Sequence, residues 1–395
     1  MNAFLNFLSN GILDWSLGQM VVYTLIVTHI TIASVTIYLH RHSAHRALDL
    51  HPIPAHFFRF WLWLTSGQHT KEWTAIHRKH HAKCETEEDP HSPVTKGLST
   101  VLWQGADLYR LEAKNPETLQ KYGAGTPDDW MERHVYTPLT FYGIILMLLI
   151  DFVLFGFAGI TIWAIQMAWI PFFAAGVING IGHWWGYRNF DSPDTSTNIS
   201  PWGMLIGGEE LHNNHHTYAT SAKFSSKWYE FDLGWCYIRV LSALGLAKVK
   251  KTIPKAVFVS NAPVDEHTLE SIIKNRYEVM ASYAQSLRQS VKAEIEALHA
   301  TNESAAQRLS AIRKSLLRDT DHISGDVVAR VEQNIVVSPT VQKLYEMRNE
   351  LAMLWRRSGL TRDELLAHLH DWCERAEQSG IEALQRFSLQ LRTYR

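Results

Sequence analysis

Long apolar stretches are the feature that most constrains how this chain can fold. Residues 19–39 carry no charged side chain and have about the 20 residues that a helix needs to span the hydrocarbon core of a bilayer. Residues 137–182 have room for two more spans, about 137–157 and 160–182, with a turn near Gly156 and Gly159. We therefore expect an all-α fold, an integral membrane helical bundle.

The distribution of basic residues predicts the orientation of this bundle. Lys and Arg crowd the segment after the first span, whereas the connection between the second and third spans has none. By the positive-inside rule this segment faces the cytoplasm, in an inner or cytoplasmic membrane. Residues 53–70 are apolar and aromatic but interrupted by Arg59, so we expect a helix lying in the membrane interface. No basic region followed by a small-residue cleavage site opens the sequence, and no removable signal peptide is expected.

The chain changes character near residue 264. Beyond it, Glu, Arg, Gln, Ala and Leu recur with helical periodicity, which predicts a soluble helical appendix. Pro254 and Pro263 flank a linker, so we divide the sequence into a membrane domain, 1–263, and a C-terminal helical extension, 264–395. Lys and Arg number 38 against 39 Asp and Glu, so a nucleic-acid partner is not expected. Three widely separated cysteines fit a reducing compartment.

Histidines gather in the first part of the chain, where 16 of the 21 lie between His29 and His216. The pattern H-x-x-H-H occurs twice, and on an α-helix residues three and four apart share a face, so each run presents three imidazoles in one direction, as a metal ion requires. A pair five residues apart and an Asn-x3-His pair at the end of the third span accompany them. The candidate metal ligands are His40, His45, His77, His80, His81, Asn179, His183, His212, His215 and His216.

Nine imidazoles are more than one ion can coordinate, so the sequence predicts two metal ions. His40 and His45 are about 140° apart on a regular helix, so either the helix unwinds near Ser43 and Ala44 or the two histidines reach different metals. Asn179 is a weak ligand and would act through a water. Spacing alone does not name the metal, because imidazole suits zinc, copper, iron and nickel.

The same motifs carry a resemblance to a known family. In chain order they are H-x4-H from His40, E-W-x3-H-R-x-H-H from Glu72, D-P-H from Asp89, N-x3-H from Asn179, G-Y-R from Gly186 and G-E-x2-H-N-x-H-H from Gly208. Their spacing, intervening residues and order resemble the membrane fatty acyl desaturases of the stearoyl-CoA type, over about residues 19–250. The resemblance implies that the nine histidines hold two iron ions in a cytoplasmic cap, with Asn179 linked through a water and no catalytic residue beyond the metal centre. It also places Trp73 near the acyl tunnel, although packing alone would explain this residue as well.

The implied activity uses dioxygen and two electrons to introduce a cis double bond, at the delta-9 position, into a saturated acyl chain. The resemblance favours acyl-CoA as the substrate, with a phospholipid-linked acyl chain as the alternative. A di-iron fatty acid or alkane hydroxylase uses similar histidine boxes, but the N-x3-H and H-N-x-H-H details favour desaturation. An alternative of a different class is a non-catalytic membrane scaffold that binds metal.

Electrons must reach such a centre from outside, because the sequence shows no H-P-G-G haem-binding stretch and no flavin or iron–sulfur motif. We expect a separate donor of the ferredoxin, rubredoxin or cytochrome type with its reductase. We call the histidine motifs at residues 40–45, 77–81 and 212–216 the first, second and third boxes. Lys79 and Lys83 lie in or beside the second box and would attract an acidic redox protein. Every candidate ligand precedes residue 264, so we expect the helical extension to be dispensable for the chemistry.

Overall fold

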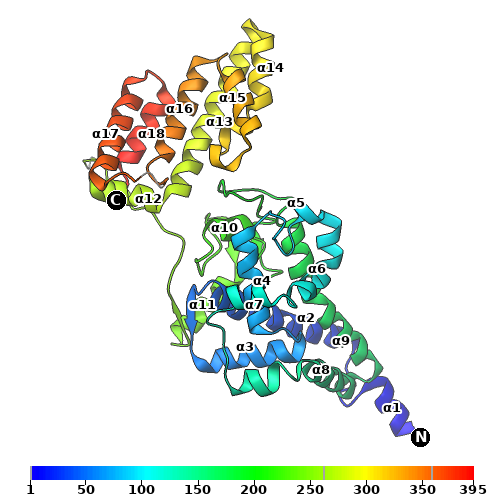
Figure 1. The fold of residues 1–395 in the computed structure, drawn as a ribbon. Coiled ribbons are helices and arrows are strands. Elements are labelled where there is room, and N and C mark those ends of the chain that lie inside the picture. The colour runs from blue at the N-terminus through cyan, green and yellow to red at the C-terminus, as the bar shows by residue number, and fades with distance from the viewer. Residues whose placement is uncertain (1, 261–262, 357–358) are drawn as a thin grey trace. The chain divides into compact units, whose positions relative to one another are not determined.

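The computed structural model describes residues 2–260, 263–356 and 359–395 and divides the chain into two compact units (Figure 1). The first unit comprises Met1–Arg188 and Asp194–Ile253. The second comprises Pro254–Arg395 together with the short segment Asn189–Pro193. The division at Pro254 lies ten residues before the boundary expected from composition, and the sequence placed 189–193 with the membrane domain.

The first unit is mainly helical, with three π-helical segments and four short strands. Its helices are α1 (Asn2–Asn10), α2 (Leu17–Ser34), η1 (Val35–Ala44), α3 (Pro52–Thr65), α4 (Thr70–Lys83), α5 (Pro93–Lys96), α6 (Leu98–Glu112), α7 (Pro116–Tyr122), η2 (Glu132–Tyr136), α8 (Thr140–Phe155), α9 (Phe157–Ile170), η3 (Pro171–Ile181), α10 (His212–Thr217) and α11 (Leu233–Ala243). The strands form an antiparallel pair, β1 (Leu48–Leu50) with β4 (Ala247–Val249), and a parallel pair, β2 (Trp202–Gly203) with β3 (Phe231–Asp232).

Among the described residues of this unit, two helices are long and apolar enough to cross a membrane. They are Leu17–Ala44, formed by α2 and η1, and Phe157–Ile181, formed by α9 and η3. The predicted second span is α8, which has 16 residues and is shorter than the length that usually crosses a bilayer. It packs against α9, and α9 packs against α2, so the three predicted spans lie together (Figure 1). The predicted interfacial helix is α3, which ends at Thr65.

Small residues bring α6 and η3 unusually close. A β-carbon at Gly105 of α6 would lie 2.4 Å from the carbonyl oxygen of Ala175, and one at Gly176 of η3 would lie 2.4 Å from that of Leu102. Only glycine allows this approach of the two backbones. The packing fixes the end of η3, from which the chain enters the histidine-rich region.

The second unit has a hydrophobic core of its own. Its helices are α12 (Glu266–Lys274), α13 (Arg276–Thr301), α14 (Glu303–Ile312), η4 (Ser315–Leu317), η5 (Thr320–His322), α15 (Gly325–Ile335), α16 (Pro339–Ala352), α17 (Arg362–Gln378) and α18 (Glu382–Arg392). The long helix α13 contacts α14, α16 and α18 and buries Tyr283 and Leu287 among them. The Tyr283 hydroxyl donates to the carbonyl of Leu344, and the Trp372 indole donates to that of Met347, so the polar atoms of both rings are satisfied.

Candidate metal centre

A π-helix brings together the two histidines that are five residues apart. At the end of η1 the His45 amide donates to the carbonyl of His40 over 3.1 Å, which is the i to i+5 hydrogen bond of a π-helix. This wider turn places residues five apart on one face, and both imidazoles join one cluster. The first alternative is close to what is observed, because a π-helix has less twist per residue than an α-helix, although the change extends over Val35–Ala44 and is not confined to Ser43 and Ala44. The second alternative is wrong, because the two histidines do not reach different groups.

The nine histidines form two groups. The first histidine group has ligand atoms within 4.8 Å of one another and contains His40, His45, His77, His81 and His215. The second histidine group contains His80, His183, His212 and His216; His80, His183 and His216 meet the same distance limit together with Cys84, and His212 joins through His183. Every histidine ligand that the sequence predicted thus lies in one of two adjoining groups.

The ring nitrogens of each group have spacings suited to a metal ion. In the first group the Nε2 atom of His215 lies 3.0 Å from that of His40 and 3.0 Å from that of His81. In the second group the Nε2 atoms of His183 and His212 are 3.0 Å apart. Two nitrogens that each lie about 2.1 Å from one ion at a right angle are about 3 Å apart. The donor set therefore fits two metal ions with imidazole ligands.

Each H-x-x-H-H run divides its histidines between the two groups. On α4, His77 and His81 belong to the first group and His80 to the second. On α10, His212 belongs with His216 to the second group, whereas His215 belongs to the first. The i,i+4 pair serves one group and the i+3 residue serves the other. Each run was expected to present its three imidazoles in one direction, and they do share a side of the helix, but this side faces two adjacent sites.

Residues between the histidines hold the boxes together. The Arg78 guanidinium donates to the carbonyls of Ser43 and Ala44, 2.8 and 2.9 Å away, and so caps the end of η1 with a side chain from α4. Arg78 also donates to the carbonyls of Tyr122 and Ala124. This side chain therefore helps to hold α4, which carries His77, His80 and His81, against the end of η1, which carries His40.

A second arginine attaches η1 to the loops around the third box. Arg41 is fully buried and forms an ion pair with Asp232 at 2.9 Å. It also donates to the carbonyls of Gly207 and Ala222 and lies 3.8 Å from the centre of the Phe224 ring. Leaving this charge unpaired would be costly in a buried position, so the contacts fix η1 against the 207–232 region.

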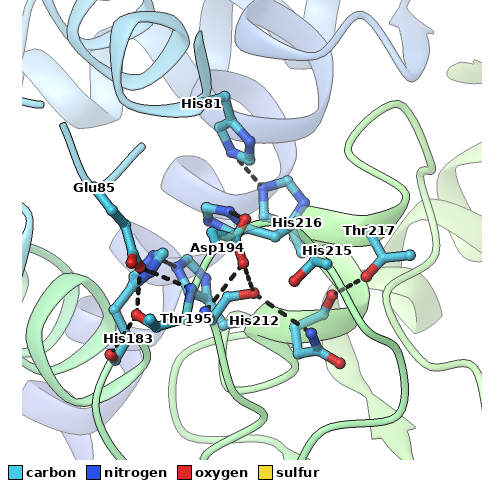
Figure 2. A network of polar contacts seen from close by, with 12 residues as sticks. His81, Glu85, His183, Asp194, Thr195, His212, His215, His216 and Thr217 are labelled. Carbon is cyan, nitrogen blue, oxygen red and sulfur yellow. Dashed lines mark hydrogen bonds and ion pairs between the residues drawn. The ribbon is translucent and has the colours of Figure 1, made fainter. Parts of the chain in front are cut away.

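Four carboxylates orient the outer nitrogens of ligand histidines. The Nδ1 atom of His40 lies 2.7 Å from Glu209, that of His80 lies 3.0 Å from Asp89, that of His183 lies 3.1 Å from Glu85, and that of His216 lies 2.8 Å from Asp194. Figure 2 shows Glu85 and Asp194 directed at His183 and His216. A carboxylate at Nδ1 fixes the proton there and leaves the lone pair of Nε2 facing the centre of the group.

The remaining predicted ligand histidines are kept neutral by their surroundings. Burial, followed by repulsion between neighbouring imidazoles, holds the pKa of His45, His77 and His81 well below the ordinary value. Burial has the same effect on the pKa of His212 and His215. Neutral imidazole is the form that binds a metal ion.

Other candidate residues lie around the groups in supporting positions. Trp73 stacks on His77 with the ring centres 4.8 Å apart and packs into the core beneath η1, so it supports a ligand. Asn179 is half-buried on η3, four residues before His183, and its water-mediated role stays a prediction. His91 is buried against His80, with ring centres 4.4 Å apart. Burial raises the pKa of the Cys84 thiol, which disfavours its thiolate form.

The sequence did not single out Glu85 and Asp194. Both lie in loops, and a sequence motif does not show where a loop runs in the fold. Asp194 also lies 22 residues before His216, the histidine that it contacts. The backbone of Glu85 is in the left-handed region, with a φ of 65°, although the residue is not glycine. Such a conformation in a non-glycine residue is costly and often marks a functional position.

Comparisons with known proteins identify the family. Residues 17–243, which contain both histidine groups, match the model of the fatty acid desaturase family. The chain belongs to this family. The second unit has a separate similarity, since residues 266–395 match a family model described as a transposase.

Curated relatives of the desaturase region act on different kinds of acyl substrate, according to their names. The chain is 32% identical over 219 residues to a "probable lipid desaturase, chloroplastic" of Arabidopsis thaliana, covering 54% of this chain and 58% of that protein. It is 31% identical to an acyl-CoA 5-desaturase of Anemone leveillei, covering 54% and 65% of the two chains. It is 30% identical to an sn-1 stearoyl-lipid 9-desaturase of Synechocystis, covering 58% and 70%. The chain thus spans little more than half the length of the first of these desaturases.

Proposed function

We propose that this chain is an O2-dependent fatty acyl desaturase with two iron ions held by the two histidine groups. The observation that carries the proposal is the convergence of nine imidazoles, with ligand nitrogens about 3 Å apart, in a region that belongs to the desaturase family. Membership of this family supports a fatty acyl substrate and a membrane location. The two long apolar helices support the same location.

The protein residues have distinct tasks in this proposal. The first histidine group would hold one iron through five imidazoles, and the second would hold the other through four imidazoles and, by way of a water, Asn179. When bound, the two irons would supply the oxidising power for the reaction, in which dioxygen, two electrons, two protons and two hydrogen atoms from adjacent methylenes give the olefin and two molecules of water. The carboxylates at Nδ1 keep four of the ligand imidazoles oriented. Five of the nine ligand histidines are buried and four are partly buried, which limits the access of bulk water and protects a strongly oxidising site from side reactions.

We propose a saturated acyl chain as the substrate and a cis double bond at the delta-9 position. Two relatives whose names specify this position support it, an acyl-lipid desaturase of Arabidopsis and the Synechocystis protein. The motif resemblance favours acyl-CoA as the activated form, whereas the names of these two relatives favour a lipid-linked chain. Trp73, stacked on His77, would contact the acyl chain close to the metal groups.

We further propose that the site faces the cytoplasm and receives electrons from a separate redox protein. The density of basic residues after the first span supports this orientation. The structure weakens one part of the earlier expectation, because Lys79 is paired with Glu112 at 2.8 Å and its side chain is only 12% exposed. Lys83 is paired with Glu88. Electrostatic attraction of an acidic donor by these two lysines is therefore small.

Product analysis tests the proposal. The purified full-length chain, given iron, an electron donor system, dioxygen and either stearoyl-CoA or a stearoyl phospholipid, is expected to form an olefin and to contain about two irons per chain. An alcohol product would show a hydroxylase, and no product with metal bound would show a scaffold. A single zinc per chain in protein made with ample iron would refute the di-iron assignment. Formation of the olefin from only one of the two substrates would identify the acyl carrier.

A further inference from the structure

A short loop joins the second histidine group to the second unit through the chain itself. Residues 189–193 belong to the second unit, although the residues on both sides of them belong to the first. The Arg188 guanidinium donates to the carbonyls of Asp194 and Ser196, each over 2.9 Å. The loop therefore leaves the first unit and returns to it at nearly the same place.

Within the second unit, Asp191 is the anchor of this loop. Its carboxylate lies 2.5 Å from the Arg318 guanidinium and 3.4 Å from Nδ1 of His322, and it accepts a hydrogen bond of 2.6 Å from the Asp319 amide. The neighbouring residues Phe190 and Ser192 are 2% and 0% exposed. A carboxylate with this many partners, between two buried neighbours, fixes the position of the loop in its unit.

Immediately after the loop, the chain meets the ligands of the second histidine group. The Asp194 carboxylate lies 2.8 Å from Nδ1 of His216. The Thr195 amide donates to Glu85 over 2.8 Å, and its hydroxyl donates to the carbonyl of His183 over 2.8 Å. Glu85 in turn contacts Nδ1 of His183 (Figure 2). Asp194 and Thr195 thus orient two of the four ligand histidines of this group.

Very little chain separates the anchor from the metal centre. Only Ser192 and Pro193 lie between Asp191 and Asp194, and three extended peptide steps reach at most about 11 Å. Proline also restricts the backbone at one of these two residues. Ser192 and Pro193 therefore cannot compensate for a displacement of Asp191, and the displacement reaches Asp194.

We propose that Asp191 and Arg318 are positioning residues for the second histidine group, acting through Asp194 and Thr195. The C-terminal helices then contribute to the metal centre without supplying a ligand. This inference rests on the proposed function, since it assumes that the group binds metal. It also reverses the expectation that the helical extension is dispensable for the chemistry.

The test is cobalt(II) titration of the purified full-length protein after removal of metal, followed by visible absorption. Asp191→Asn and Arg318→Gln are expected to weaken binding at one of the two sites by about tenfold, the lower end of the range for residues that orient histidine ligands. The first site should keep the affinity of the wild type.

Asp321→Asn is the matched control. Asp321 forms an ion pair with Arg356 in the same unit, at 3.0 Å, and does not belong to the ion pair between Asp191 and Arg318, so both sites should bind cobalt as in the wild type. Hydrogen exchange of α13 and α16 in each variant shows whether the second unit remains folded.

The outcomes separate the two claims. Folded Asp191→Asn and Arg318→Gln proteins that bind two ions with wild-type affinity would overturn the positioning role and leave the proposed function intact. The positioning role would also be overturned by equal weakening in Asp321→Asn, or by loss of binding only through unfolding of α13 and α16. A wild-type protein that binds no metal would overturn both claims.

Discussion

Replacing Glu209 separates the support of a ligand histidine from the general stability of its loop. The Glu209 carboxylate lies 2.7 Å from Nδ1 of His40 and accepts a 2.6 Å hydrogen bond from the Thr36 hydroxyl. Burial raises the pKa of Glu209, but His40 and then Arg41 outweigh burial and hold it below its ordinary value. Glu209→Ala removes a charged acceptor from two buried groups, whereas Glu209→Gln keeps one oxygen that can accept from His40.

The expected magnitude follows from these contacts. Outer partners of histidine ligands are each worth about 10- to 100-fold in metal affinity. Leaving the buried Nδ1–H of His40 without an acceptor costs about 1–3 kcal/mol of folding stability as well. We expect Glu209→Ala to reach the upper part of this range in affinity for the first metal site. Glu209→Gln should lose about tenfold or less.

The neighbouring Glu210 provides the control. Glu209 and Glu210 are both 5% exposed, but Glu210 accepts from the amides of Ile206 and Gly208 and contacts no ligand histidine. Glu210→Gln should therefore lower thermal stability without changing metal affinity per folded chain. Metal titration and thermal unfolding of the three variants in the same detergent provide both readouts. Equal metal affinity in Glu209→Ala and Glu210→Gln would refute the orienting role of Glu209.

The remaining predictions concern ligands, a clamp and pH. His77→Ala and His212→Ala should each abolish the olefin product and remove one metal from a protein that still inserts into the membrane. The control variants His29→Ala and His56→Ala should keep appreciable activity in a cell-based lipid assay. Similar behaviour of the two pairs would contradict the ligand assignment. Arg78→Met should lower the free energy of unfolding by about 2 kcal/mol, because it leaves carbonyls at the end of η1 without donors. Arg110 forms an exposed ion pair with Asp107, so Arg110→Met should change the free energy of unfolding little by comparison. A hydrogen bond to Glu72 raises the pKa of His69 above 6.5. The stability that protonated His69 contributes is therefore complete below pH 6.5 and is lost as pH rises through the raised pKa. Thermal unfolding between pH 6 and 8 should show this loss, and an unchanged dependence of stability on pH in Glu72→Gln would contradict it.

Much of the metal centre could be predicted because its ligands recur at short spacings along the chain. The runs at His77 and His212 are visible as patterns, and the total of nine imidazoles predicts two metal ions. The division of each run between two groups could not be predicted, because it depends on where the facing helices place a second set of nitrogens. The carboxylates of Glu85 and Asp194 were missed for a related reason, since tertiary packing alone brings them to His183 and His216.

The fold shows the same difference between local and long-range information. The apolar stretches predicted α2, α8 and α9 because hydrophobic length is read directly from composition. The assignment of 189–193 to the second unit was beyond reach, because no local property of these residues distinguishes them from their neighbours. Contacts with residues more than 120 positions away, such as those of Asp191, reveal it.

The π-helix at the end of the first span has a consequence for insertions and deletions in this segment. Residues five apart on a π-turn and residues four apart on an α-turn occupy nearly equivalent positions around the helix axis. A relative with one residue fewer between its first two histidines could therefore build the same site on an ordinary α-helix. In an alignment, such a gap would mark a change of helix type with the ligand geometry preserved.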